Sequence, residues 1–325
     1  MKILITGGSG FVGTHLKQAF SNNDQVFIGS HKLCVKTLDD TCINCYDKQC
    51  ACAKDVYFPL DDVSKMISVL LKHKFDIIYH LAAQSSVFLS FQDPLNTFEL
   101  NVTGTMNLIS VVSTYFSKTR IIFISSSDIY QMSDSTFVLN ENQLLEAKSP
   151  YAHSKLTIDQ FVRMNAEKLN LNAIIIRQFN SIGPGQKDNF VMPSFAKQIA
   201  EMKVLNKEKI IRVGNIGVYR DFIDVRDSVK AYALLKDAKV KSGEVFNICR
   251  GTAIKVKTCL EMLIQLSGLQ DVKIEIDEKK FRKDDLQFVC GSNEKIKKAL
   301  SWEPLIPIEQ TLADMLTYWE EKVSI

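Results

Sequence analysis

Two side chains with complementary proton chemistry lie one helical turn apart in this sequence. Tyr151 is followed four residues later by Lys155, so the phenol and the ammonium share one face of a helix. That spacing predicts a phenol pKa below its ordinary value of about 10. Ser126, the middle member of a serine cluster, is placed to donate a hydrogen bond to a substrate oxygen. The three residues are therefore a candidate proton-transfer site.

A glycine-rich turn near the start of the chain predicts a dinucleotide site. The turn follows the apolar run 2–5 and reads Thr6-Gly7-Gly8-Ser9-Gly10-Phe11-Val12-Gly13. We expect Gly7 to permit a tight turn, Gly10 to admit a pyrophosphate and Gly13 to let the helix pack closely on the strand. The helix N-terminus then offers free N–H groups to phosphate. The predicted cofactor contacts here are Gly7, Gly10, Phe11, Val12 and Gly13, and a glycine turn of another α/β fold is the alternative.

The end of the second predicted strand indicates which dinucleotide binds. An NAD site usually has a carboxylate there for the ribose 2′-hydroxyl. This strand instead ends Ile28-Gly29-Ser30-His31-Lys32, with no acid. Ser30 and Lys32 suit a 2′-phosphate, so NADP(H) is favoured over NAD(H). The alternative for Lys32 is that it opens a solvated loop.

Further cofactor contacts are predicted at the ends of the next two strands. Asp61 is placed to meet the adenine, and Leu81, Ala82 and Ala83 are small or apolar residues against which a dinucleotide can lie. Asn101 is a polar residue in an otherwise apolar helix. It suits a buried structural hydrogen bond as well as a site residue.

The elements that must position these residues alternate between strands and helices, which predicts an α/β fold with a doubly wound parallel Rossmann sheet. The predicted strands are Lys2–Thr6, Gln25–Gly29, Val56–Leu60, Asp76–His80, Arg120–Ser125 and Asn172–Arg177. The predicted helices are Gly10–Ser21, Asp62–His73, Pro94–Phe116 and Tyr151–Leu169.

The regular alternation of strands and helices ends after the last of these strands. We expect residues 1–178 to form the NADP-binding Rossmann domain, with a returning segment at about 222–248, and residues 179–325 to form a smaller C-terminal α/β substrate lobe. Within the lobe, a helix is expected near Pro193–Met202 and a short strand near Lys209–Val213. The sequence has no internal repeat and no low-complexity tract.

Composition limits the function classes. With 325 residues, 46% of them hydrophobic, the chain can bury a large core, and a formal charge of +3 argues against nucleic acid or an anionic membrane as a partner. No apolar run approaches the roughly 20 residues needed to span a bilayer. Because the glycine-rich strand starts at residue 2, we expect no signal peptide and a cytoplasmic location.

Five of the eight cysteines crowd one segment of the predicted loop between the second and third strands. They are Cys34, Cys42, Cys45, Cys50 and Cys52. The last four have the number of thiolates for a zinc site, but their spacing is compressed and no histidine is interleaved. We expect free, reduced thiols and no metal.

Several other segments match a known family. They are His80–Val87, Asn101–Thr105, Phe179–Gln186, Phe195–Ile199, Arg220–Asp227 and Leu300–Pro304. With the glycine turn, Ser126, Tyr151 and Lys155, they resemble the extended short-chain dehydrogenase/reductases, the NAD-dependent epimerase/dehydratase family, over essentially the whole chain. Within that family the sequence is most similar to GDP-4-keto-6-deoxy-D-mannose reductases and to GDP-mannose 4,6-dehydratases.

The resemblance implies a nucleotide-sugar substrate and residues that bind it. By position, Asn180, Lys197, Arg220 and Arg282 would bind the diphosphate and nucleotide, together with Gln84 and Ser85. Cations and amides suit phosphate oxygens. The structural alternatives are that Arg220 pairs with Asp221 or Asp224, and Arg282 with Asp284 or Asp285.

The resemblance leaves the reaction open between related chemistries. Dehydratases typically carry a glutamate as an added acid/base two residues before the tyrosine that matches Tyr130, and this chain has Asp128 there. Because segment 179–199 is more similar to the reductases, we expect NADPH-dependent reduction of a 4-keto group. A 4,6-dehydratase and a 4-epimerase are the alternatives, and a non-enzymatic dinucleotide sensor is a remote one. The nucleotide base, the sugar and the C4 stereochemistry stay open.

The resemblance also implies an oligomer. In this family, the helices expected from about Gly104 and from Tyr151 commonly pair with their copies in a four-helix bundle, which implies a homodimer. The apolar positions of these helices are equally compatible with core packing.

Overall fold

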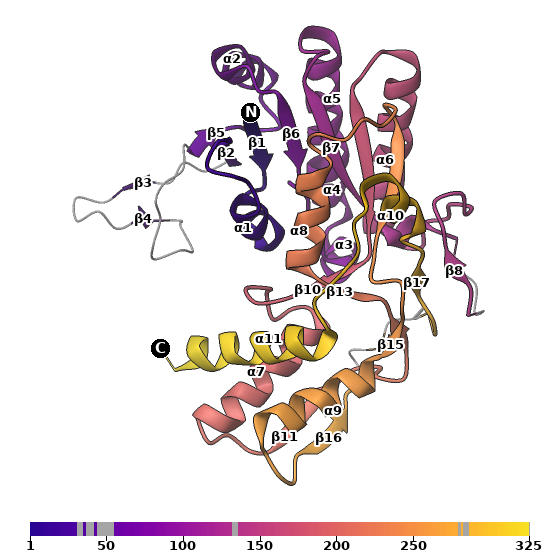
Figure 1. The fold of residues 1–325 in the computed structure, drawn as a ribbon. Coiled ribbons are helices and arrows are strands. Elements are labelled where there is room, and N and C mark those ends of the chain that lie inside the picture. The colour runs from indigo at the N-terminus through magenta and orange to yellow at the C-terminus, as the bar shows by residue number, and fades with distance from the viewer. Residues whose placement is uncertain are drawn as a thin grey trace. The chain divides into compact units, whose positions relative to one another are not determined.

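A computed structural model describes residues 1–30, 35–36, 42–43, 55–131, 136–278, 281 and 286–324 (Figure 1). The chain divides into two compact units. The first comprises Met1–Gln131, Leu144–Gln178 and Val229–Phe246, and the second Met132–Gln143, Phe179–Ser228 and Asn247–Ile325.

Seven strands of the described chain form the central sheet. They are β1 (Lys2–Thr6), β2 (Gln25–Ser30), β5 (Asp55–Tyr57), β6 (Ile77–His80), β7 (Arg120–Ser126), β9 (Ala173–Gln178) and β14 (Glu244–Ile248). Their order is β14-β9-β7-β6-β1-β2-β5. The pairs from β5 across to β9 are all parallel. The predicted doubly wound α/β sheet is therefore confirmed. The short strands β3 (Val35–Lys36) and β4 (Cys42–Ile43) pair antiparallel outside it.

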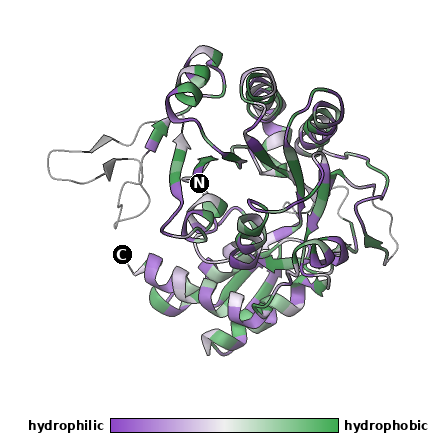
Figure 2. Ribbon diagram, turned by 45° about the horizontal axis from the view of Figure 1, so that its top comes forward, coloured by the Kyte–Doolittle hydropathy of each residue, from purple (hydrophilic) through white to green (hydrophobic). Residues whose placement is uncertain are grey.

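The central strands are apolar along their length because both faces of the sheet are covered. Ile3, Leu4 and Ile5 are consecutive residues of β1, and each is fully buried. Successive side chains point to opposite faces, so a run with no exposed member requires helices on both sides. Figure 2 shows the corresponding hydrophobic colouring of the strands and the mixed colouring of the helices around them.

The helices of the first unit lie between these strands in the chain. They are α1 (Phe11–Gln18), α2 (Val63–His73), α3 (Val87–Gln92), α4 (Pro94–Phe98), α5 (Gly104–Tyr115), α6 (Pro150–Lys168) and α8 (Val225–Leu234). One hydrophobic cluster joins buried residues of α2, α5 and α6 to the sheet. On the other face, the Tyr79 hydroxyl donates to the backbone oxygen of Tyr232 on α8, at 2.9 Å.

Local chemistry fixes the starts of two helices. The Asp62 side chain accepts the N–H of Lys65 at 2.8 Å, and Ser149 accepts that of Ala152 at 3.1 Å. Pro150 occupies the first turn of α6, where its missing N–H costs no hydrogen bond. The start of the helix that carries Tyr151 is therefore fixed by both a cap and a proline.

The predicted long helix Pro94–Phe116 is interrupted in the structure. A π-helical turn, Glu99–Thr103, separates α4 from α5. Asn101 lies in this turn with its side chain buried and hydrogen-bonded, and one extra residue per turn accommodates it. Helix α3 was not predicted, and β5 is shorter than the predicted strand Val56–Leu60.

The second unit combines short strand pairs with four helices in its described residues. The strands are β8 (Val138–Leu139), β10 (Asn180–Ile182), β11 (Ile210–Val213), β12 (Tyr219–Arg220), β13 (Phe222–Asp224), β15 (Ile254–Lys255), β16 (Lys273–Ile276) and β17 (Cys290–Gly291). The helices are α7 (Val191–Val204), α9 (Val256–Ser267), α10 (Glu294–Leu300) and α11 (Ile308–Val323). Apolar residues of α7, α9, α11 and β11 form its core.

No helix within the described ranges is both long enough and apolar enough to cross a membrane.

Candidate functional site

The glycine turn between β1 and α1 is packed so tightly that side chains are excluded. Gly7 has a positive φ of 67°, and a Cβ there would lie 2.8 Å from the Ala82 Cα. A Cβ on Gly13 would lie 2.5 Å from the Gly8 Cα. Gly13 therefore packs on the backbone of the turn itself, and the predicted reason for this glycine, close packing on the strand, is corrected.

The first turn of α1 is open to an anion. Gly10 is its N-cap residue, so no side chain caps this fully described helix, and the Gly10 N–H donates to Gly7 O at 3.0 Å. The uncapped N–H groups and the positive end of the helix dipole suit phosphate oxygens. The turn therefore fits the pyrophosphate of a dinucleotide.

A buried histidine ties β1, β6 and α5 together beside this turn. His80 Nδ1 lies 2.8 Å from Thr6 Oγ1, and its Nε2 lies 2.8 Å from Thr105 Oγ1. Burial and the charge of Lys155 lower the pKa of His80 to about 3. The ring is therefore neutral at physiological pH and serves as a hydrogen-bonding spacer.

Asn101 links the segment that follows β6 to helix α6. Its Oδ1 accepts the Gln84 N–H at 2.8 Å, and its Nδ2 donates to Gln84 O and to Ser154 Oγ, each at 2.9 Å. The Ser154 hydroxyl in turn donates to Tyr151 O at 2.7 Å. Of the two predicted roles, the structure has Asn101 in the structural one.

Ser126 and Tyr151 are brought into hydrogen-bond contact. Ser126 ends β7, and its Oγ also accepts the Asp128 N–H at 3.2 Å. Burial raises the pKa of Tyr151, the charge of Asp128 raises it further, and the hydrogen bond with Ser126 opposes both. The predicted lowering of this pKa is therefore wrong for this structure, because burial of the phenol outweighs the hydrogen bond with Ser126.

Lys155 lies on the same face of α6 as Tyr151, and both side chains are buried. Its Nζ donates to Ile124 O at 2.8 Å and lies 5.4 Å from the centre of the Phe123 ring. Burial lowers the pKa of Lys155 to about 8. This ammonium therefore exchanges its proton close to physiological pH.

Asp128 is the acidic group nearest in the chain to the Ser126 hydroxyl. It lies in the short helical turn Ser127–Ile129 and is partly exposed. Its charge acts on Tyr151 through space, so the carboxylate and the phenol belong to one electrostatic site. This is the position at which a dehydratase acid/base was predicted.

The remaining predicted cofactor residues lie at strand ends of the first unit. Ser30 ends β2, Asp61 is exposed shortly after β5, and residues 81–83 follow β6. Leu81 donates its N–H to Thr6 O at 3.1 Å, next to the glycine turn. Lys32 lies outside the described residues.

Gln84 is engaged in its own turn. Its side-chain amide donates to Ser86 O at 3.0 Å and to Thr97 Oγ1 at 3.1 Å, and its Oε1 accepts the Ser86 N–H. The neighbouring Ser85 is exposed. Of the predicted pair of substrate residues, Gln84 therefore shapes the turn and Ser85 presents a hydroxyl.

The predicted phosphate-binding residues lie in the second unit. The β10–β13 register places Asn180 beside Phe222, two residues beyond Arg220. Lys197 pairs with Asp188 at 2.6 Å, and Arg220 donates to Tyr219 O at 2.8 Å and Leu286 O at 2.7 Å. Arg282, with its predicted alternatives Asp284 and Asp285, lies outside the described residues.

The acids considered as alternative partners of Arg220 have hydrogen-bond partners elsewhere. Asp221 accepts the N–H groups of Arg250, Gly251 and Gly291 at 2.7–3.1 Å. Burial raises its pKa to about 6. Asp224 forms a two-pronged pair with Arg226, at 2.9 and 2.7 Å.

A second buried phenol close to Tyr151 was not predicted. The Tyr232 hydroxyl on α8 donates to Gln178 Oε1 at 2.5 Å. Burial and the charge of Tyr151 raise the pKa of Tyr232. A tyrosine on the buried face of an amphipathic helix gives no signal in sequence that separates this position from ordinary core packing.

No cluster of three or more potential metal ligands occurs among the residues that the structure describes. The thiols of Cys249, Cys259 and Cys290 are free and buried. Cys34, Cys45, Cys50 and Cys52 lie outside the described residues, as does the side chain of Cys42.

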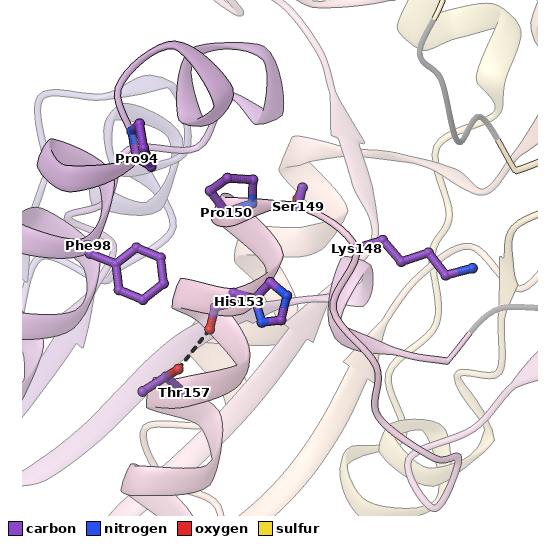
Figure 3. A pocket seen from close by; sticks show the side chains of 7 residues that line it. All are labelled: Pro94, Phe98, Lys148, Ser149, Pro150, His153 and Thr157. Atoms are coloured by element: carbon purple, nitrogen blue, oxygen red, sulfur yellow. Dashed lines mark hydrogen bonds between the residues drawn. The ribbon is translucent and has the colours of Figure 1, made fainter.

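A shallow pocket of about 450 Å³ lies at the start of α6 (Figure 3). It is lined by Pro94, Phe98, Lys148, Ser149, Pro150, His153 and Thr157. His153 and Thr157 belong to the exposed face of α6, whereas Tyr151 and Lys155 belong to the buried face. The pocket is therefore separate from the proton-transfer residues.

Known proteins match this chain over most of its length. The family profile described as GDP-mannose 4,6 dehydratase matches residues 4–315. A GDP-6-deoxy-D-mannose reductase of Pseudomonas aeruginosa is 34% identical over 76% of this chain and 81% of its own. A GDP-6-deoxy-D-talose 4-dehydrogenase of Aggregatibacter actinomycetemcomitans is 29% identical over 92% of this chain and 91% of its own.

Solved structures share the fold. The structure of RMD from Pseudomonas aeruginosa complexed with NADPH covers 99% of both chains at a TM-score of 0.83 and 30% identity. A UDP-glucose 4-epimerase of Thermotoga maritima with UDP-glucose covers 99% of this chain and 100% of its own, at a TM-score of 0.84 and 24% identity. The second match shows the fold alone.

Proposed function

Because this chain belongs to the GDP-mannose 4,6-dehydratase family, we propose that it is a nucleotide-sugar 4-ketoreductase. Its substrate would be a nucleotide-linked 4-keto-6-deoxy-hexose of the GDP-4-keto-6-deoxy-mannose type, and its hydride donor NADPH. A relative named as a GDP-6-deoxy-D-mannose reductase supports this choice. The structural observation that carries it is the placement of Tyr151 and Lys155 together on the buried face of α6, with Ser126 buried at the end of β7.

Reduction of a ketone needs an acid at the carbonyl oxygen. NADPH, when bound, supplies the hydride to the carbonyl carbon. The Ser126 hydroxyl donates a hydrogen bond that orients the carbonyl, and Tyr151 gives its proton to the oxygen as negative charge develops there. Burial raises the pKa of Tyr151, so the phenol is protonated at physiological pH, as the acid of a reduction must be at the start of the reaction.

Lys155 completes the proton-transfer site. We propose that its ammonium binds the nicotinamide ribose and stabilises the tyrosinate left after proton transfer. With its pKa near 8, Lys155 also exchanges a proton with solvent within the physiological range. The same residue therefore both positions the cofactor and helps to restore the Tyr151 proton.

The residues present fit a dinucleotide. The pyrophosphate would lie against Gly10, Phe11 and Val12, where α1 is uncapped, and the adenine would face Asp61. Ser30 ends β2 without a carboxylate, which favours a 2′-phosphate, and the structure of a relative complexed with NADPH supports the same choice. NAD(H) remains the alternative cofactor.

The second unit is proposed to bind the substrate diphosphate and base. Asn180, Lys197, Arg220 and Arg282 are the proposed contacts. Lys197 is paired with Asp188, so substrate binding there would exchange a carboxylate for a phosphate.

A 4,6-dehydratase is the second candidate function. Asp128 acts electrostatically on Tyr151, which supports its carboxylate as the added acid/base of this reaction. Its side chain is one methylene shorter than the glutamate typical of dehydratases, and reduction is preferred because segment 179–199 is more similar to the reductases.

We propose a homodimer in the cytoplasm. Three apolar side chains of α3 and α4 are strongly exposed: Phe88 by 68%, Phe91 by 62% and Leu95 by 78%. The helices that carry them, α3 and α4, both pack against α6, and exposed apolar groups of this size favour a protein interface. Sedimentation of wild-type protein and of Leu95→Asp tests this: a wild-type monomer would contradict it.

Absorbance at 340 nm tests the proposed reaction. Purified protein receives NADPH, and separately NADH, with enzymatically prepared GDP-4-keto-6-deoxy-mannose. We expect substrate-dependent oxidation that is faster with NADPH and falls by about 10²–10⁴-fold in Tyr151→Phe, the range for loss of a general acid.

Two outcomes would overturn the proposal. Conversion of GDP-mannose to a keto-sugar without added cofactor, and no NADPH oxidation, would establish the dehydratase. Interconversion of a sugar and its C4 epimer without net change in cofactor would establish an epimerase.

A further inference from the structure

A fully buried ion pair connects the catalytic helix to the sheet. The Arg177 guanidinium holds both carboxylate oxygens of Asp159, from Nε to Oδ2 at 3.0 Å and from Nη2 to Oδ1 at 2.9 Å. The two side chains are 1% and 0% exposed. Burial lowers the pKa of Arg177, but the hydrogen bonds and charge of Asp159 outweigh this and raise it. Arg177 therefore keeps its charge in the buried pair.

Each end of this pair lies next to the proton-transfer residues. Asp159 is four residues after Lys155 and eight after Tyr151 on α6, so the three share the buried face of that helix. Arg177 lies on β9 opposite Ser125 of β7, and the next pair in register includes Ser126. The pair thus joins the helix of the acid to the strand that adjoins its hydrogen-bond partner.

The same guanidinium also holds the segment that follows Ser126. Its central carbon lies 5.0 Å from the centre of the Tyr130 ring, and a hydrogen bond with Tyr130 contributes to the raised pKa of Arg177. Tyr130 is fully enclosed and lies two residues beyond Asp128. One planar cation therefore contacts two of the segments that carry catalytic groups.

A buried ion pair adds little net stability, but it fixes the relative position of the two elements that it joins. Desolvation of two charges commonly cancels their attraction, so apolar replacement is often neutral. A two-pronged guanidinium–carboxylate pair, however, fixes distance and direction, whereas apolar contacts allow a helix to slide. Proton transfer is sensitive to such displacements.

We propose that Asp159 and Arg177, with Tyr130, are positioning residues that set the separation between Tyr151 on α6 and Ser126 on β7. This inference rests on the proposed reductase function and adds the device that holds its acid in place. Loss of the pair lowers kcat and changes substrate and NADPH binding little, because most of the proposed binding residues lie on elements other than α6 and β7.

The test compares three variants with the wild-type protein. Arg177→Met/Asp159→Leu removes both charges together, so no buried charge is left unpaired and the protein is expected to fold. Arg177→Lys keeps the charge but not the two-pronged geometry. Arg226→Met is the matched control, because it removes a guanidinium from the buried Asp224 carboxylate in the second unit.

For the double variant and Arg177→Lys, we expect kcat to fall about 10–100-fold, with KM and the NADPH dissociation constant within about two-fold of wild type. For Arg226→Met, we expect a lower unfolding midpoint and an unchanged kcat. A folded double variant with wild-type kcat, or with a raised KM alone, would overturn the proposal.

Crystal structures separate this inference from the proposed function. If the wild-type protein reduces no keto-sugar, the reductase proposal fails. The positioning role is then tested by comparing the Ser126–Tyr151 hydrogen bond in crystal structures of the wild type and the double variant. Its loss in the double variant supports the role, and its retention refutes it.

Discussion

Replacing Lys155 by methionine should make the folded protein more stable at neutral pH while abolishing reduction. The pKa of Lys155 falls from 10.5 to about 8 on burial. Each pKa unit corresponds to about 1.4 kcal/mol, so burying this ammonium costs about 3 kcal/mol. The methionine variant loses the hydrogen bond to Ile124 O, worth about 1 kcal/mol. The expected net gain in the free energy of unfolding is about 2 kcal/mol at pH 7.

The gain should disappear as the pH rises, and the sign follows from proton binding. Below pH 8 Lys155 is protonated in both the folded and the unfolded state, so the folded wild type bears the full cost. Between pH 8 and 10.5 the folded state releases its proton first, and wild-type stability rises relative to the variant. Near pH 10.5 only the lost hydrogen bond remains, and the wild type becomes the more stable protein.

Urea unfolding at pH 7, 8.5 and 10 in reducing buffer measures this difference. Lys168→Met is the matched control, because Lys168 is exposed at the end of the same helix. Its effect should not depend on pH over this range. A Lys155→Met protein that is less stable than wild type at pH 7, or a difference that is equal at pH 7 and 10, would refute the reasoning.

Three further substitutions probe the rest of the site. Gly13→Ala would place a Cβ 2.5 Å from a backbone carbon, so thermal unfolding should show a loss of about 1–3 kcal/mol and NADPH fluorescence a weakened affinity; unchanged binding would contradict the packing argument. Asn101→Ala removes three hydrogen bonds and should lower the free energy of unfolding by about 2–3 kcal/mol. Asn107→Ala removes one and should lower it by about 1 kcal/mol, so equal losses would contradict this ranking. Asp128→Asn removes a charge that raises the pKa of Tyr151, so kcat should begin to fall at a lower pH than in wild type, and an unshifted or upward-shifted limb would exclude that coupling.

The sheet was largely predictable because its strands are buried on both faces. Such strands read as short continuous apolar runs, and Lys2–Thr6 and Ile77–His80 were recognised in this way. The starts of capped helices were equally predictable, since Asp62 and Ser149 precede α2 and α6. These signals are local, so a single sequence contains them.

The missed elements depend on distant contacts. Helix α3 exposes Phe88 and Phe91, so its hydrophobic pattern does not mark a buried face. The π-helical turn depends on hydrogen bonds from Asn101 to Gln84, 17 residues away, and to Ser154, 53 residues away. Sequence spacing along one helix gives no sign of partners on other elements.

The residues of the candidate site also fall into a group that the sequence predicts and a group that depends on distant contacts. The fixed spacing of Tyr151 and Lys155, and of the glycine turn, places these groups on known faces before any fold is built. The Asp159–Arg177 pair joins residues 18 positions apart and is defined only once α6 lies against β9. A charged residue inside a strand pattern is a weak signal of such a pair, because an exposed edge would explain it equally well.

Protonation states were the least predictable feature, because they depend on competing effects of similar size. From spacing alone, Lys155 should lower the pKa of Tyr151, yet enclosure raises it and lowers that of Lys155 to about 8. The enclosed phenol is protonated when hydride arrives, and the enclosed amine exchanges a proton with water near neutrality. A reductase requires both properties. The burial that makes Lys155 costly for folding is therefore the same burial that prepares it for proton transfer, and stability and reduction should change in opposite directions when it is replaced.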